Sequence, residues 1–131
     1  MPRGAIIGGR DTDGSQIFVG RAAHDGDLIP AKVIPSKQVA YIPLNGAEIA
    51  KHNFDVLCGS DVKWKKERNG KIPKGAYPGG TTRAGEVLYI GRVDHNMSQT
   101  VGKVHPSHGC LYIPYGGKEM PFKDYEVLTG N

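Results

Sequence analysis

The sequence has little cysteine, with two residues among 131, whereas a secreted domain held by disulfides usually carries more. It has no apolar run near the roughly 20 residues that a membrane-spanning helix needs. The first ten residues, MPRGAIIGGR, lack the apolar segment of a signal peptide. We therefore expect a cytoplasmic protein with reduced thiols, and release by an unconventional route or association with vesicles remains an alternative.

A helical period is also missing, because no window of 11 residues repeats its apolar residues every three to four positions. The 19 glycines and 9 prolines interrupt helices and favour turns. Segments such as QIFVGRA (16–22), QVAYIPL (38–44) and DVKWKK (61–66) alternate in polarity and are rich in β-branched and aromatic residues. The sequence predicts an all-β chain of about ten short antiparallel strands in two packed sheets.

An internal repeat dominates the chain. Residues 2–58 align with residues 73–129 at an offset of 71 without a gap, and 20 of the 57 aligned positions are identical. Two copies are too few for a solenoid, so a pseudo-twofold pair sharing one core fits the length better. We predict one domain, residues 1–131, made of these two repeats and a strand-containing linker, residues 59–72.

The repeated motifs resemble those of a known family. The order IFVGRA, GDLIPAK, YIP and then VL, given twice with minor changes, is similar to the tandem repeat of the DM-nine family. That resemblance covers nearly the whole chain and implies a compact all-β domain that forms a homodimer. The family includes invertebrate mannose-binding lectins and the N-terminal parts of natterin-like toxins. The resemblance therefore implies a lectin for mannose-type glycans or microbial polysaccharide, acting in innate immune recognition of microbes.

The resemblance also implies site residues. The sugar-binding aspartate and lysine of the lectins match Asp11 and Lys32, and in the second repeat the matching residues are Thr82 and Lys103. Asp27 is a further candidate acceptor, in a segment (residues 25–30) expected to be a loop beside Lys32. A carboxylate accepts and an ammonium donates, so the pair can hold two neighbouring sugar hydroxyls. We expect a complete first site and an altered second one; a simple Asp11–Lys32 ion pair is the structural alternative.

Other polar residues have structural interpretations. Arg21 and Arg92 recur at the repeat offset, and we expect each to pair with a carboxylate, with Glu48 and Glu119 as the candidates. A ligand-clamping role is the alternative for these arginines.

His105, His108 and Cys110 lie close in sequence and raise the question of zinc. No further ligand has the spacing of a zinc site, so we expect no metal and no other cofactor. No nucleophile and base are paired recognisably, and we expect no catalytic residue and no enzymatic activity.

The basic segment KWKKERNGKIPK, residues 63–74, holds much of the net charge of +4. Its simplest interpretation is a solvated hairpin with lysines facing outward. As an alternative function, it could bind an anionic membrane or protein surface. No nucleic-acid partner is expected.

Overall fold

The computed structural model describes residues 1–130, and thirteen strands form the regular structure of that range. They are β1 (Ile7–Arg10), β2 (Gln16–His24), β3 (Asp27–Ile34), β4 (Val39–Leu44), β5 (Ala47–Lys51), β6 (Asp55–Val56), β7 (Val62–Arg68), β8 (Pro78–Thr81), β9 (Val87–His95), β10 (Ser98–His105), β11 (Cys110–Tyr115), β12 (Lys118–Phe122) and β13 (Asp124–Gly130). Two 3₁₀ turns, η1 (Pro35–Lys37) and η2 (Pro106–His108), are the helical elements of this range. The all-β prediction is confirmed, with more strands than expected.

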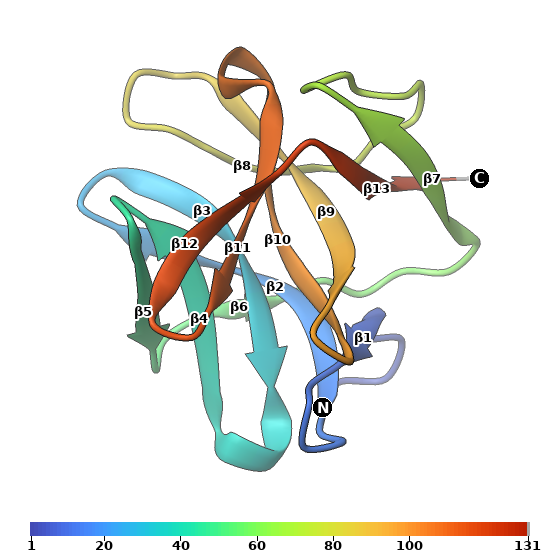
Figure 1. Cartoon of the computed structure of the whole chain (residues 1–131). Coiled ribbons are helices and arrows are strands. Elements are labelled where there is room, and N and C mark those ends of the chain that lie inside the picture. Colours follow the sequence, from blue (N-terminus) through green and yellow to red (C-terminus); the bar gives the residue numbers. More distant parts are fainter. Residues whose placement is uncertain (131) are drawn as a thin grey trace.

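The strands form one continuous antiparallel sheet, not the two packed sheets predicted. Pairing of β2 with β3 closes eight strands into a barrel in the order β2-β1-β10-β11-β12-β5-β4-β3 (Figure 1). The strand order continues from β3 through β8 to β9, which pairs back with β10, and β6 and β7 are the two ends of the order. Closure removes most exposed edges, which short twisted strands would otherwise leave unpaired.

The prediction of a loop over residues 25–30 is wrong. The turn is confined to Asp25 and Gly26, which have φ angles of 48° and 88°, and β3 begins directly at Asp27. Asp-Gly readily adopts the left-handed conformation that a two-residue hairpin turn requires. The segment whose sequence differs between the two repeats is therefore mainly strand, so its side chains have fixed directions.

Strands from the two repeats pair with each other. β1 of the first repeat pairs with β10 of the second through Arg10 and Gln99. β3 of the first pairs with β8 of the second through Leu28 and Thr81. The blue-to-teal and yellow-to-red strands of Figure 1 accordingly share one barrel. Side chains of one repeat can therefore lie next to polar side chains of the other repeat.

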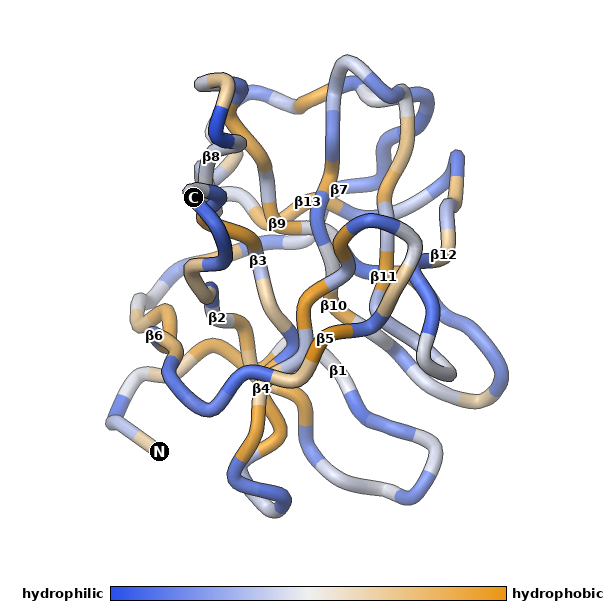
Figure 2. Tube along the Cα trace, turned by 90° about the vertical axis from the view of Figure 1, so that its left-hand side faces the viewer, coloured by the Kyte–Doolittle hydropathy of each residue, from blue (hydrophilic) through white to orange (hydrophobic). Residues whose placement is uncertain are grey.

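The core is aliphatic and β-branched, as the strand pattern predicts. Its largest fully buried side chains are Ile17, Val19, Ile29, Val33, Ile34, Ile42, Leu88, Val101, Val104, Leu111, Ile113 and Leu128. Figure 2 shows hydrophobic stretches along the inner strands and hydrophilic residues at outlying turns. Two lysines lie among these apolar residues, with Lys32 3% and Lys103 4% exposed. A buried ammonium is costly unless it is paired, so the surroundings of these lysines are informative.

The predicted linker contains β7, as expected, and β7 pairs along its length with β13. Val62 and Trp64 are half-buried and pack against a core cluster. Lys63, Lys65 and Lys66 are exposed, which confirms that these lysines face outward. The predicted hairpin over residues 63–74 is wrong, because β7 pairs with β13 and no strand of residues 1–130 lies between β7 and β8.

Candidate functional site

Lys32 lies on β3 and is enclosed by groups from both repeats. Its Nζ lies 3.1 Å from Glu48 Oε2 and donates to the Pro114 carbonyl oxygen at 2.5 Å. The ring centroids of Tyr41 and Tyr115 lie 5.6 and 5.5 Å from Nζ. The ammonium is therefore neutralised by a carboxylate and flanked by two aromatic rings.

Lys103 occupies the matching position on β10. Its Nζ lies 2.9 Å from Glu119 Oε2, and the Tyr112 ring centroid is 5.4 Å away. Within residues 1–130, no carbonyl accepts a hydrogen bond from this ammonium in the way that Pro114 does for Lys32. Lys103 thus keeps donor capacity that Lys32 uses inside the protein.

The two glutamates are fixed by the opposite repeat. Glu48 Oε1 accepts the backbone N–H of Gly117 at 2.9 Å, and Glu119 Oε1 accepts that of Gly46 at 3.0 Å. Both glutamate side chains are largely buried, at 14% and 12% exposure. Each carboxylate therefore joins a lysine of its own repeat to a turn of the other repeat.

A cavity of about 220 Å³ opens beside Lys103. It is lined by Asp27, Ile29, Leu44, Asn45, Thr82, Lys103, His105, His108, Tyr112 and Glu119. Three of the five residues predicted for sugar binding, Asp27, Thr82 and Lys103, thus lie around one cavity. Because the lining includes an ammonium, two carboxylates and two hydroxyls, it can both donate hydrogen bonds to a small polar ligand and accept them from it.

The expected position of Asp27 beside Lys32 is wrong. Asp27 Oδ1 accepts the backbone N–H of Arg83 at 2.7 Å, in the loop that follows β8, and the side chain lines the Lys103 cavity. The cause is the pairing of β3 with β8, which brings the start of β3 to the second repeat. The first repeat thus supplies a carboxylate to the lining of the cavity beside Lys103.

Asp11 and Lys32 do not form the ion pair considered as the structural alternative. Asp11 Oδ2 lies 3.8 Å from Lys37 Nζ, and Asp11 Oδ1 accepts the backbone N–H of Thr12 at 2.8 Å. Lys37 also lies 3.1 Å from Asp13, whose pKa is lowered to about 2, first by the Ser15 backbone N–H and hydroxyl and then by Lys37. Asp11 and Lys32 therefore each have another charged partner.

His105, which lines the Lys103 cavity, is hydrogen-bonded to Glu86. His105 Nε2 lies 2.9 Å from Glu86 Oε1, which also accepts from the Ser107 hydroxyl at 2.6 Å. The Ser107 hydroxyl is the main cause that lowers the pKa of Glu86. Burial lowers the pKa of His105, and His108, stacked on it at 3.6 Å, adds to this effect while Glu86 opposes it. Among the buried side-chain nitrogen and oxygen atoms of residues 1–130, only His105 Nδ1 has no hydrogen-bond partner.

Tyr112 links these histidines to Lys103. His108 Nδ1 lies 3.0 Å from the Tyr112 hydroxyl, and burial, with a smaller effect from Cys110, raises the pKa of Tyr112 to about 12. The hydroxyl is therefore a neutral group that can donate or accept near the cavity.

The arginines pair with carboxylates, but not with the ones predicted. Arg21 Nε donates to Asp55 at 3.1 Å and Arg92 Nε to Glu126 at 2.9 Å. Each pair is directly opposed across neighbouring strands. The assignment to Glu48 and Glu119 is wrong, because these glutamates are paired with the buried lysines.

The described part of the chain contains no group of three or more His, Cys, Asp or Glu side chains placed to hold a metal. His105 and His108 stack on each other instead, and both cysteines are unpaired.

Sequence reasoning missed the roles of Glu48, Glu119 and His105. The glutamates could have been found, because both recur at the offset that relates the two lysines. His105 could not, because its counterpart in the first repeat is Ile34.

Fold and site together define an all-β repeat protein in which buried lysine–glutamate pairs are shared between the repeats. The DM9 repeat matches residues 11–122, and the chain belongs to this family. It is 35% identical to Natterin-3 of Thalassophryne nattereri over 82 residues, which are 60% of the chain and 20% of that protein. It is 25% identical to Natterin-4 over 135 aligned residues, 100% of the chain and 32% of the relative. The chain thus spans about a fifth to a third of the length of these curated relatives.

Proposed function

We propose that this protein is a non-enzymatic lectin that binds mannose-type glycans. The observation that supports this proposal is the cavity beside Lys103, whose lining combines the buried Lys103–Glu119 pair with Asp27 and Thr82. Neighbouring hydroxyls of a sugar need both donors and acceptors at short spacing, and this set supplies them. A cavity of ~150 Å³ can hold benzene. The cavity of about 220 Å³ therefore accommodates most of a six-membered sugar ring with its hydroxyls.

We further propose that the repeats are related by a pseudo-twofold axis. Ala47 pairs with Lys118, and these residues occupy equivalent positions of the two repeats. The pairs Arg10–Gln99 and Leu28–Thr81 also exchange under the offset of 71. This relation gives two lysine centres, around Lys32 and around Lys103. Thr82 and Asp27 line the cavity of the Lys103 centre, and Asp11 and Ser98 are the matching positions for the Lys32 centre.

Affinity for a single sugar should be weak. Each charge-assisted hydrogen bond contributes about 1.5–3 kcal/mol, while association costs at least several kcal/mol. We expect a dissociation constant near ~1 mM for one site. A homodimer, which we propose, raises avidity for polysaccharide by presenting several sites on one particle.

The proposed setting is the cytoplasm, with recognition of microbial or vesicle glycans in innate immunity. No helix in residues 1–130 is long and apolar enough to cross a membrane. The outward lysines of β7 support a second candidate function, the binding of anionic membrane or protein surfaces. Salt separates the two functions, since surface electrostatics weaken steeply with ionic strength whereas hydrogen bonding to neutral sugars does not.

The test is titration of the intact chain with mannose and mannan by calorimetry. Asp27→Ala should weaken binding at least tenfold if the Lys103 cavity is used, while Ser98→Ala changes the matching position of the other repeat. Asp11→Ala and Thr82→Ala form the second matched pair, in which loss with Asp11→Ala assigns binding to the Lys32 centre. Binding unchanged in all four variants contradicts the proposed site. No binding up to tens of millimolar sugar contradicts the function.

A further inference from the structure

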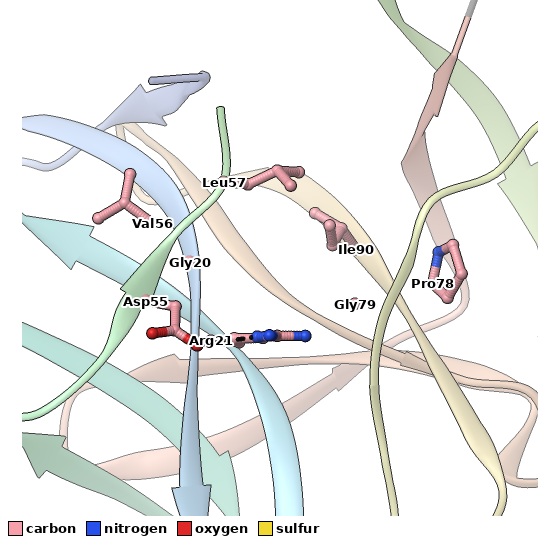
Figure 3. Close-up of a pocket in the computed structure, with 8 residues that line it drawn as sticks. All are labelled: Gly20, Arg21, Asp55, Val56, Leu57, Pro78, Gly79 and Ile90. Carbon is pink, nitrogen blue, oxygen red and sulfur yellow. Dashed lines mark hydrogen bonds and ion pairs between the residues drawn. The ribbon is translucent and has the colours of Figure 1, made fainter. Parts of the chain in front are cut away.

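A second cavity lies next to β6. It has a volume of about 200 Å³. Its lining residues are Gly20, Arg21, Asp55, Val56, Leu57, Pro78, Gly79 and Ile90. In Figure 3 the Arg21 side chain extends from Asp55 toward Gly79 and Pro78, with Leu57 and Ile90 above it. An apolar space is therefore bordered by one guanidinium.

The edge of the sheet beside this cavity is open. β6 is the end of the strand order, and within residues 1–130 it pairs with β2 alone among the strands. In the second repeat, the matching segment of β13 has β7 on its outer edge, with Trp64 opposite Leu128. The chain thus contains an occupied version of the edge that β6 leaves open.

Arg21 and Arg92, which occupy matching positions, differ in their surroundings at the open and the covered edge. The ring centroid of Trp64 lies 4.1 Å from Arg92 Cζ, and Arg92 also bonds to Glu126 and to the Gly8 carbonyl. Its side chain is 17% exposed. The Arg21 side chain is 50% exposed and pairs with Asp55. Arg21 therefore has a bare guanidinium face where its counterpart is stacked on an indole.

We propose that the β6 edge and the Arg21 cavity dock an extended segment of a second protein that carries an aromatic side chain. By the register of β7 on β13, the aromatic residue lies opposite Leu57 and stacks on Arg21. Lys66 of β7 lies opposite Glu126, so a basic residue two positions after the aromatic one faces Asp55. The partner motif is thus an aromatic residue, any residue and a basic residue in a strand.

The physical basis is strand addition with a specific pocket. Main-chain hydrogen bonds along an open edge supply affinity, and a pocket for an alternate side chain supplies specificity. A cavity of ~150 Å³ holds benzene, so about 200 Å³ is enough for an aromatic ring. Gly20 lets β6 approach closely, since an added Cβ would collide with the Asp55 carbonyl oxygen. The β7 strand of another copy is not available, because seven residue pairs hold it to its own β13.

The test uses the intact chain and a labelled peptide, DVKWKKERN, which copies residues 61–69. Saturable binding is expected by fluorescence anisotropy. Replacing the peptide tryptophan by alanine should weaken binding about 10- to 30-fold, and Arg21→Ala in the protein should do the same. Arg21→Lys keeps the charge without the planar face and should be intermediate. Gln16→Ala, on the same strand away from the cavity, is the folded control and should bind normally.

Two further observations decide the location. Amide shifts on peptide addition should be confined to residues 53–57 and their β2 neighbours, with residues 124–130 unchanged. Shifts at residues 124–130 would mean that the peptide displaces β7, and this would overturn the proposal. Absence of saturable binding up to about 1 mM peptide, or affinity unchanged by Arg21→Ala, would overturn it as well. Mannose should have no effect on peptide binding, so the result is separate from that of the sugar titration.

Discussion

The Lys32 and Lys103 centres share a lysine, a glutamate and the tyrosine at the matching position, Tyr41 or Tyr112, but differ in the residues around them. Tyr115 places its ring beside Lys32, whereas the equivalent position of the first repeat is Leu44, which lines the cavity beside Lys103. The smaller leucine leaves room where the tyrosine closes the site. The residues around a retained lysine–glutamate pair therefore decide whether it is enclosed by protein or borders a cavity.

The position of this cavity differs from the asymmetry expected from sequence, in which the first repeat holds the complete site. Asp11 and Lys32 retain the residue types of the lectin members, but Lys32 is bonded to Glu48 and to the Pro114 carbonyl. Thr82 replaces the aspartate beside Lys103, while Asp27 supplies a carboxylate from the other repeat. The geometry thus favours the second centre as the roomier site.

Removal of the glutamates should produce the largest difference in stability between the two centres. Glu48→Ala leaves the enclosed Lys32 ammonium without its carboxylate and the Gly117 N–H without its acceptor, and we expect a loss of about 3–5 kcal/mol in unfolding free energy. Glu119→Ala should cost about 1–3 kcal/mol, because water can enter the cavity beside Lys103. Urea denaturation at neutral pH measures both losses.

The matched control for these variants is Glu→Gln at each position, which keeps an oxygen for the backbone N–H. Glu48→Gln should recover part of the loss of Glu48→Ala. Equal losses for the two alanine variants would show that the Lys103 centre is as enclosed as the Lys32 centre.

The two arginines give the next largest contrast. Arg92→Ala removes a stacked and largely buried guanidinium and should lower the unfolding free energy by about 2–3 kcal/mol. Arg21→Ala removes an exposed ion pair and should cost less than about 1 kcal/mol. Thermal and urea denaturation of both variants check the difference. A loss for Arg21→Ala as large as that for Arg92→Ala would mean that Arg21 already has a stacking partner.

The sequence was sufficient for local structure because alternation is a local property. The strands around QIFVGRA and DVKWKK were predicted, as was the outward direction of Lys63 and Lys65. Closure of the sheet was not, because it depends on contacts such as Arg10 with Gln99, which lie far apart in the chain. A period of two shows which face a residue is on, but not which strand lies next to it.

The site errors have the same origin. Asp27 was expected beside Lys32 because both lie in one segment, but strand pairing carries the start of β3 to the other repeat. The repeat offset indicated that Glu48 and Glu119 matter, whereas register decided their partners. Arg21 lies directly opposite Asp55 across β2 and β6. Its partner is therefore a carboxylate to which the sequence pattern assigned no role.

The smallest expected effect concerns pH and the histidine that only the second centre has. Burial lowers the pKa of His105 in the folded state below its ordinary value of 6.5. The unfolded chain therefore binds the proton first as pH falls, so the stabilisation is complete above about pH 6.5 and is lost below it, toward the folded pKa. His105→Ile, which introduces the residue of the matching position, Ile34, should reduce the stability lost between pH 7.5 and pH 5.5. Urea midpoints of both proteins at these pH values measure this difference in stability.

The carboxylate of Glu86 does not affect this measurement. Its pKa is lowered in the folded chain, so the stability that it contributes is lost only at pH values more acidic than 5.5. An unchanged pH dependence in His105→Ile would show that His105 is protonated as easily in the folded chain as in the unfolded one.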